Sequence, residues 1–252
     1  MPDEAPPPVG EAGAVLQATG VVKRFGELVV LDGVDFTVGA DEAVGVVGPN
    51  GAGKTTLLSV LAGSQAPSAG SVSFRGEDVT RLGAARRCRL GVGRAYQVPR
   101  PFGGMTVLEN LVVGATSGAR LRGTTAYQRC IEVLARTGLI EVANRRADSL
   151  GLLDRKRLEL ARALTTGPAV LLLDEIGAGL TDAEAAQLVA TIKGLRSGGV
   201  AVVWIEHIVH VLVQVVDRLV CMDAGRVIAD GPPAEEMSNA RVIDAYLGRG
   251  AA

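Results

Sequence analysis

Residues 48–56 read Gly-Pro-Asn-Gly-Ala-Gly-Lys-Thr-Thr, which is the GxxxxGK[ST] pattern of a phosphate-binding loop. An apolar run at 43–47 precedes the loop, and a helix-like segment at 57–62 follows it. In that strand–loop–helix context, backbone N–H groups point into the loop and the helix N-terminus adds its positive dipole end. A glycine-rich turn that binds nothing has no use for Gly-Lys-Thr at the start of an apolar helix. We therefore predict that the chain binds a nucleoside triphosphate.

Each part of this loop has an expected task. Its glycines let the backbone curl, so that successive N–H groups face the phosphate oxygens. Lys54 can reach the β- and γ-phosphates, and the hydroxyl of Thr55 can ligate Mg²⁺. The loop residues expected to bind the nucleotide are Gly48, Pro49, Asn50, Gly51, Ala52, Gly53, Lys54, Thr55 and Thr56.

Asp174 and Glu175 follow directly on the buried-type run at 169–173. An acid in this position often only caps a helix. A carboxylate at the end of a central parallel strand, however, lies at the edge where open α/β sheets bind ligands. With the phosphate-binding loop upstream, we expect Asp174 to hold Mg²⁺, directly or through water. We expect Glu175 to polarise the water that attacks the γ-phosphate.

The apolar run at 200–205 ends in Glu206 and His207, which places a histidine at the same predicted sheet edge. A single histidine is usually structural, but this position favours a contact between His207 and the γ-phosphate. His210, one helical turn later, is expected to be structural. Glu206 is a rival general base. We prefer Glu175, because it lies next to the acid expected to bind the metal.

Composition limits the classes of protein that fit. The chain has 252 residues, 48% hydrophobic and 3% aromatic, which fits an α/β protein with a core of Leu, Val and Ala. The net charge of −1 gives no global attraction to nucleic acid. The three cysteines have no metal-like spacing, and no apolar stretch reaches the length of a membrane span. Residues 1–13 lack the features of a signal peptide and are expected to form a disordered leader.

Hydrophobic periodicity predicts one domain over residues 14–248, with a β-rich core at 14–96 and 165–248 and a helical subdomain inserted at 97–164. Tyr127, Ile131 and Leu134 are expected to share one helix face. The segment 208–216 fits a strand or a helix. Strands are expected at 14–22, 29–38, 43–47, 71–74, 169–173, 200–205, 219–222 and 227–229, and helices at 81–89 (exposed), 106–113, 126–137, 155–164 and 183–196.

Taken with Gln97, the loop, Asp174-Glu175 and His207 resemble the nucleotide-binding subunit of ATP-binding cassette (ABC) transporters. The resemblance extends from about residue 16 to residue 247. It implies a P-loop ATPase fold with a RecA-like mixed and parallel sheet, an antiparallel N-terminal β subdomain and a helical subdomain. It also implies that Phe25 stacks on adenine, and that Gln97 senses Mg²⁺ and the γ-phosphate and contacts the membrane subunits. Gly179-Leu-Thr-Asp182 is similar to the loop that crosses the dimer interface.

A narrower resemblance is to the ATPases of branched-chain amino acid and urea uptake. It rests on Met105-Thr-Val-Leu-Glu-Asn-Leu111, Thr137-Gly-Leu139, Trp204-Ile-Glu-His207 and Asp244-Ala-Tyr-Leu-Gly248. Such subunits are cytoplasmic and peripheral on the inner face of the membrane. They pair with a second ATPase subunit, with separate permeases and, indirectly, with a solute-binding protein.

The chain departs from the family at its signature sequence. Where the family has Leu-Ser-Gly-Gly-Gln or a close variant, residues 150–154 read Leu-Gly-Leu-Leu-Asp. The resemblance implies that this helix N-terminus presents N–H groups to the γ-phosphate held by the other subunit. Gly151 still allows close approach, but the hydroxyl donor is lost and Leu153 adds bulk. The loss of one charge-assisted hydrogen bond, about 1.5–3 kcal/mol, would weaken one site without abolishing ATP binding.

The sequence thus predicts a Mg²⁺-dependent ATPase subunit of an importer for a small polar solute such as a branched-chain amino acid. One alternative is a regulatory or weakly active half of an asymmetric dimer. Another is a soluble ABC protein of translation or DNA repair, which the single P-loop and the lack of a basic patch disfavour. A GTPase is disfavoured because we find no Asn-Lys-x-Asp element. No nucleic-acid partner is expected.

Overall fold

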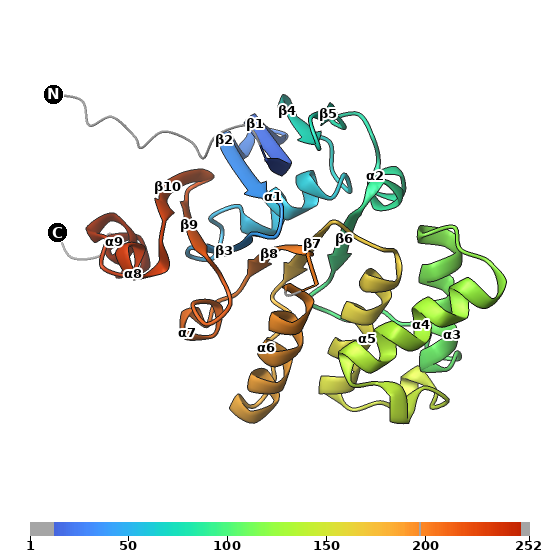
Figure 1. The fold of residues 1–252 in the computed structure, drawn as a ribbon. Helices are drawn as coiled ribbons and strands as arrows, with labels where there is room; N and C mark the ends of the chain where they lie inside the picture. The colour runs from blue at the N-terminus through green and yellow to red at the C-terminus, as the bar shows by residue number, and fades with distance from the viewer. Residues whose placement is uncertain (1–12, 197, 248–252) are drawn as a thin grey trace, which may run out of the picture.

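The computed structural model describes residues 13–196 and 198–247 and contains two sheets with helices packed between and below them (Figure 1). The first sheet is antiparallel, in the order β2-β1-β4-β5. Its strands are β1 (Ala14–Phe25), β2 (Leu28–Gly39), β4 (Ala69–Phe74) and β5 (Glu77–Asp78). The leader expected at 1–13 lies outside the described residues, except for Gly13.

The second sheet has the order β10-β9-β3-β8-β7-β6. All neighbouring strands in it are parallel except β9 and β10. The carboxyl ends of its parallel strands therefore meet at one edge, where open α/β sheets bind ligands. The strands are β3 (Ala43–Val47), β6 (Val92–Ala95), β7 (Val170–Asp174), β8 (Ala201–Ile205), β9 (Arg218–Asp223) and β10 (Arg226–Gly231).

Both faces of this sheet are buried, because alternate side chains of each strand serve two separate cores. In β7, Val170 and Leu172 pack in the core shared with the antiparallel sheet and α1 (Lys54–Leu61). Leu171 and Leu173 face the opposite core, which contains the helices of the lower half of the molecule. Helix α1 lies between the two sheets (Figure 1). Because both faces are buried, a strand of this sheet needs apolar residues at successive positions, as in the run 170–173.

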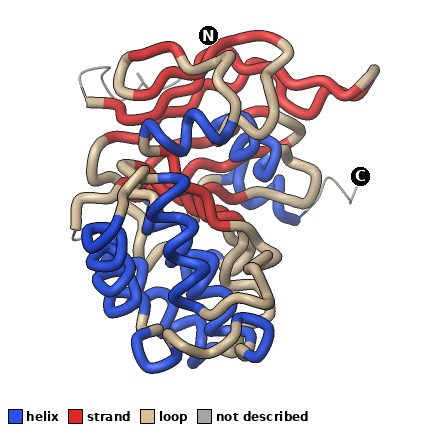
Figure 2. Tube along the Cα trace, turned by 90° about the vertical axis from the view of Figure 1, so that its right-hand side faces the viewer, coloured by secondary structure: helices blue, strands red, loops and turns tan. Residues whose placement is uncertain are grey.

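The segment between β6 and β7 is helical (Figures 1 and 2). Figure 2 shows the strands in the upper and middle part of the molecule and most helices below them. The helices of this segment are α3 (Val107–Val113), η1 (Gly114–Gly118), α4 (Gly123–Thr137), η2 (Ile140–Val142), η3 (Ala147–Ser149) and α5 (Leu152–Thr165). The other helices are α2 (Ala84–Leu90), α6 (Asp182–Arg196), α7 (Val209–Leu212), α8 (Pro233–Glu236) and α9 (Ala240–Leu247).

The predicted fold class is confirmed, and four local features differ from the expectations or decide between them. The short strand β6 was not foreseen, and the ambiguous segment 208–216 contains the helix α7. Helix α2 is not wholly exposed: Arg87 is fully buried and donates to the carbonyls of Val60 and Leu61, at the end of α1. On α4 the buried stripe is the neighbouring one, and so Tyr127 and Ile131 are exposed while Leu134 is buried.

Candidate functional site

The phosphate-binding loop connects β3 to α1 with a backbone that only glycine tolerates at two points. Gly48 has φ 145° and Gly53 has φ 100°. A Cβ atom on Gly48 would overlap the carbonyl oxygen of Met222, and one on Gly53 would lie 2.8 Å from the carbonyl oxygen of Val30. The loop encloses a hollow of about 210 Å³ whose lining includes Asn50, Gly51, Ala52, Gly53, Lys54, Thr55, Thr56 and Glu175.

Lys54 begins α1 with its ammonium folded over the loop. Its Nζ donates to the carbonyl oxygens of Gly48 at 2.7 Å and Pro49 at 2.9 Å. Burial lowers the pKa of Lys54, while the charges of Glu175 and Asp174 act in the opposite direction. The site therefore holds a desolvated cation at the mouth of an anion-binding loop. That is the arrangement a polyphosphate requires.

Thr55 and Asp174 meet beside the loop. The Thr55 hydroxyl donates to Oδ1 of Asp174 at 3.2 Å, and Asp174 is nearly buried at the end of β7. Among the described residues, no group of three or more His, Cys, Asp or Glu side chains could hold a metal on its own. A hydroxyl and one carboxylate next to a phosphate loop do fit Mg²⁺. This ion keeps several waters and binds through one or two carboxylates plus phosphate oxygens.

Glu175 lies at the centre of the predicted catalytic group. Its Oε1 is 2.8 Å from Nε2 of His207, and its Oε2 accepts a hydrogen bond from Nε2 of Gln97 at 2.5 Å. These residues follow β7, β8 and β6, so the parallel topology brings three distant parts of the chain together. Glu175 has φ 46°, an uncommon backbone conformation for a residue other than glycine. Its N–H donates to the carbonyl of Ile205, which fixes that conformation.

Glu206 is sequestered from this group. Only 3% of the residue is exposed, and its Oε1 accepts hydrogen bonds from the Gly177 N–H at 2.6 Å and from Nε1 of Trp204 at 3.2 Å. Burial raises the pKa of Glu206, and these hydrogen bonds oppose the shift. The carboxylate is thus held by the fold. It does not line the hollow of the phosphate loop.

Two predicted nucleotide contacts lie apart from the hollow. Phe25, the last residue of β1, is 47% exposed, and Nζ of Lys23 lies 4.9 Å from the centre of its ring. Gly151 precedes the first residue of α5, in extended conformation and exposed. Neither lines the hollow within this single chain.

Two cations at the site were not foreseen from the sequence. Arg94 of β6 forms an ion pair with Oδ2 of Asp174 at 2.7 Å. Lys156 of α5 is buried and donates to the carbonyl oxygen of Gln97 at 2.6 Å. Burial lowers the pKa of Lys156, and the charges of Glu206 and Glu175 oppose this. Arg94 lies in the strand that we did not predict. The helical spacing of α5 gave a signal for Lys156, because this residue lies one turn before the buried Leu160.

The chain matches two family models and several known proteins. The ABC transporter family model matches residues 31–178, and the model described as branched-chain amino acid ATP-binding cassette transporter matches residues 226–252. The chain is 36% identical to the high-affinity branched-chain amino acid transport ATP-binding protein LivG of Escherichia coli strain K12. The match covers 93% of this chain and 98% of LivG. The corresponding protein BraF of Pseudomonas aeruginosa is 36% identical with the same coverage.

A solved ATP-binding cassette of an ABC transporter in its ADP conformation has a similar structure. It superposes with a TM-score of 0.85 at 29% identity, over 94% of this chain and 99% of that one. Among the described residues of this chain, no helix is long and apolar enough to cross a membrane.

Proposed function

The chain belongs to the ABC transporter family and is an ATPase, and we propose that it powers the uptake of branched-chain amino acids. The observation that carries the catalytic part is the convergence of Glu175, His207 and Gln97 beside the phosphate-binding loop. The substrate class rests on the relatives LivG and BraF, which match over nearly their whole length, and on the C-terminal family model.

In this proposal Glu175 is the general base. It accepts a proton from the attacking water, which adds to the γ-phosphorus while the bond to the ADP oxygen breaks. His207 and Gln97 hold the two carboxylate oxygens of Glu175 and contact the γ-phosphate. Lys54 and the loop N–H groups neutralise the phosphates. Thr55, Asp174 and Gln97 would hold Mg²⁺, which supplies charge neutralisation at the phosphates when bound.

The remaining assignments complete the proposal. Phe25 stacks on adenine, and the exposed position of its ring supports this. In this proposal the chain is divided into a core at 14–96 and 165–248 and a helical subdomain at 97–164. The helical subdomain transmits motion to the permeases. The chain then acts as one half of an ATPase dimer, peripheral on the inner face of the membrane, with a solute-binding protein as indirect partner.

One feature favours a second candidate, a weakly active half of an asymmetric dimer. Residues 150–154 lead into α5 with Gly151 as the N-cap, so no side-chain hydroxyl is available there. Asp154 lies in the first turn, paired with Arg157 at 3.4 Å, and Leu152 is 44% exposed. A carboxylate at this end supports its own helix dipole but repels a phosphate. The second subunit's nucleotide would therefore receive backbone N–H groups alone.

Uptake of radiolabelled leucine by intact cells tests the transport function. Cells that lack the chain should lose high-affinity leucine uptake, and the wild-type gene should restore it. The Glu175→Gln gene should not restore it, whereas Glu132→Gln, which removes an exposed carboxylate on α4, should. Sugar uptake should stay constant throughout. Undiminished leucine uptake without the chain would reject the substrate class.

A further inference from the structure

Arg94 is a buried cation at the expected metal site. Its side chain is 8% exposed and that of Asp174 is 6% exposed, and a guanidinium nitrogen of Arg94 donates to Oδ2 of Asp174 at 2.7 Å. The other terminal nitrogen donates to the hydroxyls of Ser59 at 3.1 Å and Ser64 at 3.2 Å, at the far end of the P-loop helix. Hydrogen bonds therefore hold both terminal nitrogens of the guanidinium.

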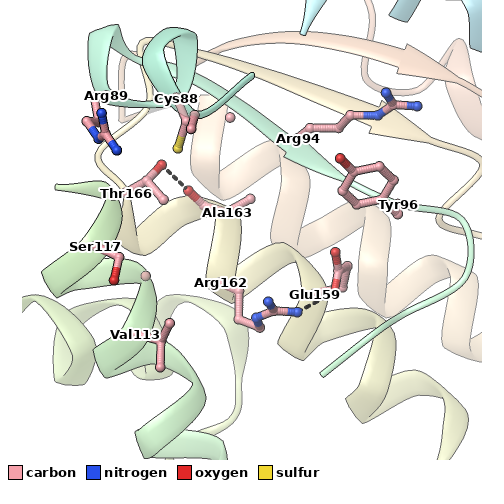
Figure 3. Close-up of a pocket in the computed structure, with 14 residues that line it drawn as sticks. Cys88, Arg89, Arg94, Tyr96, Val113, Ser117, Glu159, Arg162, Ala163 and Thr166 are labelled. Atoms are coloured by element: carbon pink, nitrogen blue, oxygen red, sulfur yellow. Dashed lines mark hydrogen bonds and ion pairs between the residues drawn. The ribbon is translucent and has the colours of Figure 1, made fainter. Parts of the chain in front are cut away.

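A third group holds Arg94 from the other side. Its guanidinium carbon lies 4.6 Å from the ring centre of Tyr96, within the range of a cation–π contact. Arg94 and Tyr96 line one wall of a groove of about 350 Å³, with Cys88 and Arg89 of α2 and Arg162 of α5 on other sides (Figure 3). Tyr96 is 44% exposed. Arg94 thus joins the wall of this groove to the carboxylate of Asp174.

The Asp174 carboxylate is shared between two partners. Oδ1 accepts from the Thr55 hydroxyl, and Oδ2 from Arg94. A carboxylate held at both oxygens has a fixed orientation, with one oxygen turned toward Thr55. The same guanidinium repels any cation that binds to Asp174, because two positive charges on one nearly buried carboxylate interact through a medium of low effective dielectric constant.

We propose that Arg94 is a positioning residue that orients Asp174 and, as its resident counter-cation, weakens the grip of Asp174 on the metal ion. This inference rests on the proposed Mg²⁺ site at Thr55 and Asp174. The repulsion outweighs the benefit of orientation. The repulsion energy between two positive charges on one buried carboxylate is larger than the entropic free energy of holding one short side chain in a single orientation. Asp174 would therefore hold the ion more loosely than it would without Arg94.

Mn²⁺ binding, followed by electron paramagnetic resonance of the free ion in the presence of ADP, tests this proposal without any catalytic turnover. Arg94→Met removes the charge and keeps most of the length. It should bind Mn²⁺ at least about tenfold more tightly than wild type, because the repulsion is gone. Arg94→Lys keeps the charge and should stay within about threefold of wild type. Arg196→Met, which breaks the exposed ion pair with Asp217, should not change Mn²⁺ binding.

The thermal unfolding temperature gives a second readout. Added Mg²⁺ and ADP should raise it more in Arg94→Met than in wild type, because the metal then replaces the missing counter-charge. Arg94→Gln should behave like Arg94→Met. Unchanged or weaker Mn²⁺ binding in a folded neutral variant overturns the proposal, and so does failure of both neutral variants to fold in excess Mg²⁺ and ADP. Absence of Mn²⁺ binding by the wild type would overturn the metal site itself, and this inference with it.

Discussion

The carboxyl edge of the parallel sheet and the N-terminus of α5 are prepared for phosphate to different degrees. At the sheet edge every predicted side chain has a partner: Lys54 holds loop carbonyls, Asp174 is shared by Thr55 and Arg94, and Glu175 is held at both oxygens. At the N-terminus of α5, Gly151 offers only its backbone, and the first turn of the helix carries the carboxylate of Asp154.

In our proposal the two regions bind phosphate through different kinds of group. The sheet edge needs charged groups at fixed positions, and four strands supply them because their carboxyl ends coincide. A helix N-terminus needs little beyond free N–H groups, so its side chains can change while the contact remains possible. We therefore expect substitutions at the sheet edge to stop ATP hydrolysis and substitutions at 150–154 to change its rate.

Glu175→Gln is expected to have the largest effect. It keeps the shape and the bond from Gln97 but removes the base, so ATP hydrolysis should fall by about 10²-fold or more. ATP binding, measured by fluorescence of a labelled nucleotide, should remain. Unchanged turnover would remove Glu175 from its proposed role and end the contrast between the two regions.

Restoring the family signature should have an intermediate effect of opposite sign. In the triple variant Gly151→Ser, Leu153→Gly and Asp154→Gln, the new hydroxyl has room, because no atom lies within 4 Å of a Cβ placed on Gly151. One regained charge-assisted hydrogen bond, about 1.5–3 kcal/mol, corresponds to an increase of hydrolysis of roughly ten- to a hundredfold in the purified chain. Phosphate release at saturating Mg²⁺ and ATP measures it. The single variant Leu152→Ala is the control, and equal rates in triple variant and wild type would show that 150–154 does not limit turnover.

Glu206→Gln should have the smallest effect. Its amide oxygen still accepts from Gly177 and Trp204, so hydrolysis should change less than about threefold and folding stability should be equal or higher. Burial raises the pKa of Glu206, so the folded protein binds a proton more readily than the unfolded chain. The stabilising effect of the substitution should be absent below the ordinary pKa of 4.5 and grow as the pH rises through the raised value.

Urea unfolding between pH 4 and pH 8 checks that expectation. Glu206→Ala is the matched control, because it leaves the Gly177 and Trp204 donors without an acceptor and should destabilise by about 1–3 kcal/mol. A Glu206→Gln protein whose free energy of unfolding falls relative to that of the wild type as the pH rises would contradict the burial argument.

The sequence foretold the parts that depend on local pattern. The phosphate loop, the apolar strands and the acids at their ends follow from motif and periodicity, and the fold class followed with them. It did not reveal β6, because Val92–Ala95 contains a glycine and an arginine and has no strand-like alternation. Arg94, which lies in β6, was therefore not assigned to the interior, and Arg87 was expected on the exposed helix at 81–89. A buried cation is recognisable only once its partners, carbonyls or a carboxylate from distant elements, are known.

The helix α4 gives the same lesson for packing. Tyr127 and Ile131 fit a helical stripe as well as Ala126 and Cys130 do. The two candidate stripes are shifted by one residue along the sequence. The contacts of α4 with α5 decide which stripe is buried, and hydrophobic periodicity alone does not predict those contacts.

The most direct test is the ratio of hydrolysis rates of Glu206→Gln and Glu175→Gln, measured side by side at saturating Mg²⁺ and ATP. Both substitutions neutralise a glutamate at the end of adjacent strands, and they differ only in whether the carboxylate faces the phosphate loop or the interior. We predict a ratio of about 50 or more, because a general base contributes about 10²-fold to the rate. A ratio near one, or a slower Glu206→Gln protein that is fully folded, would contradict it.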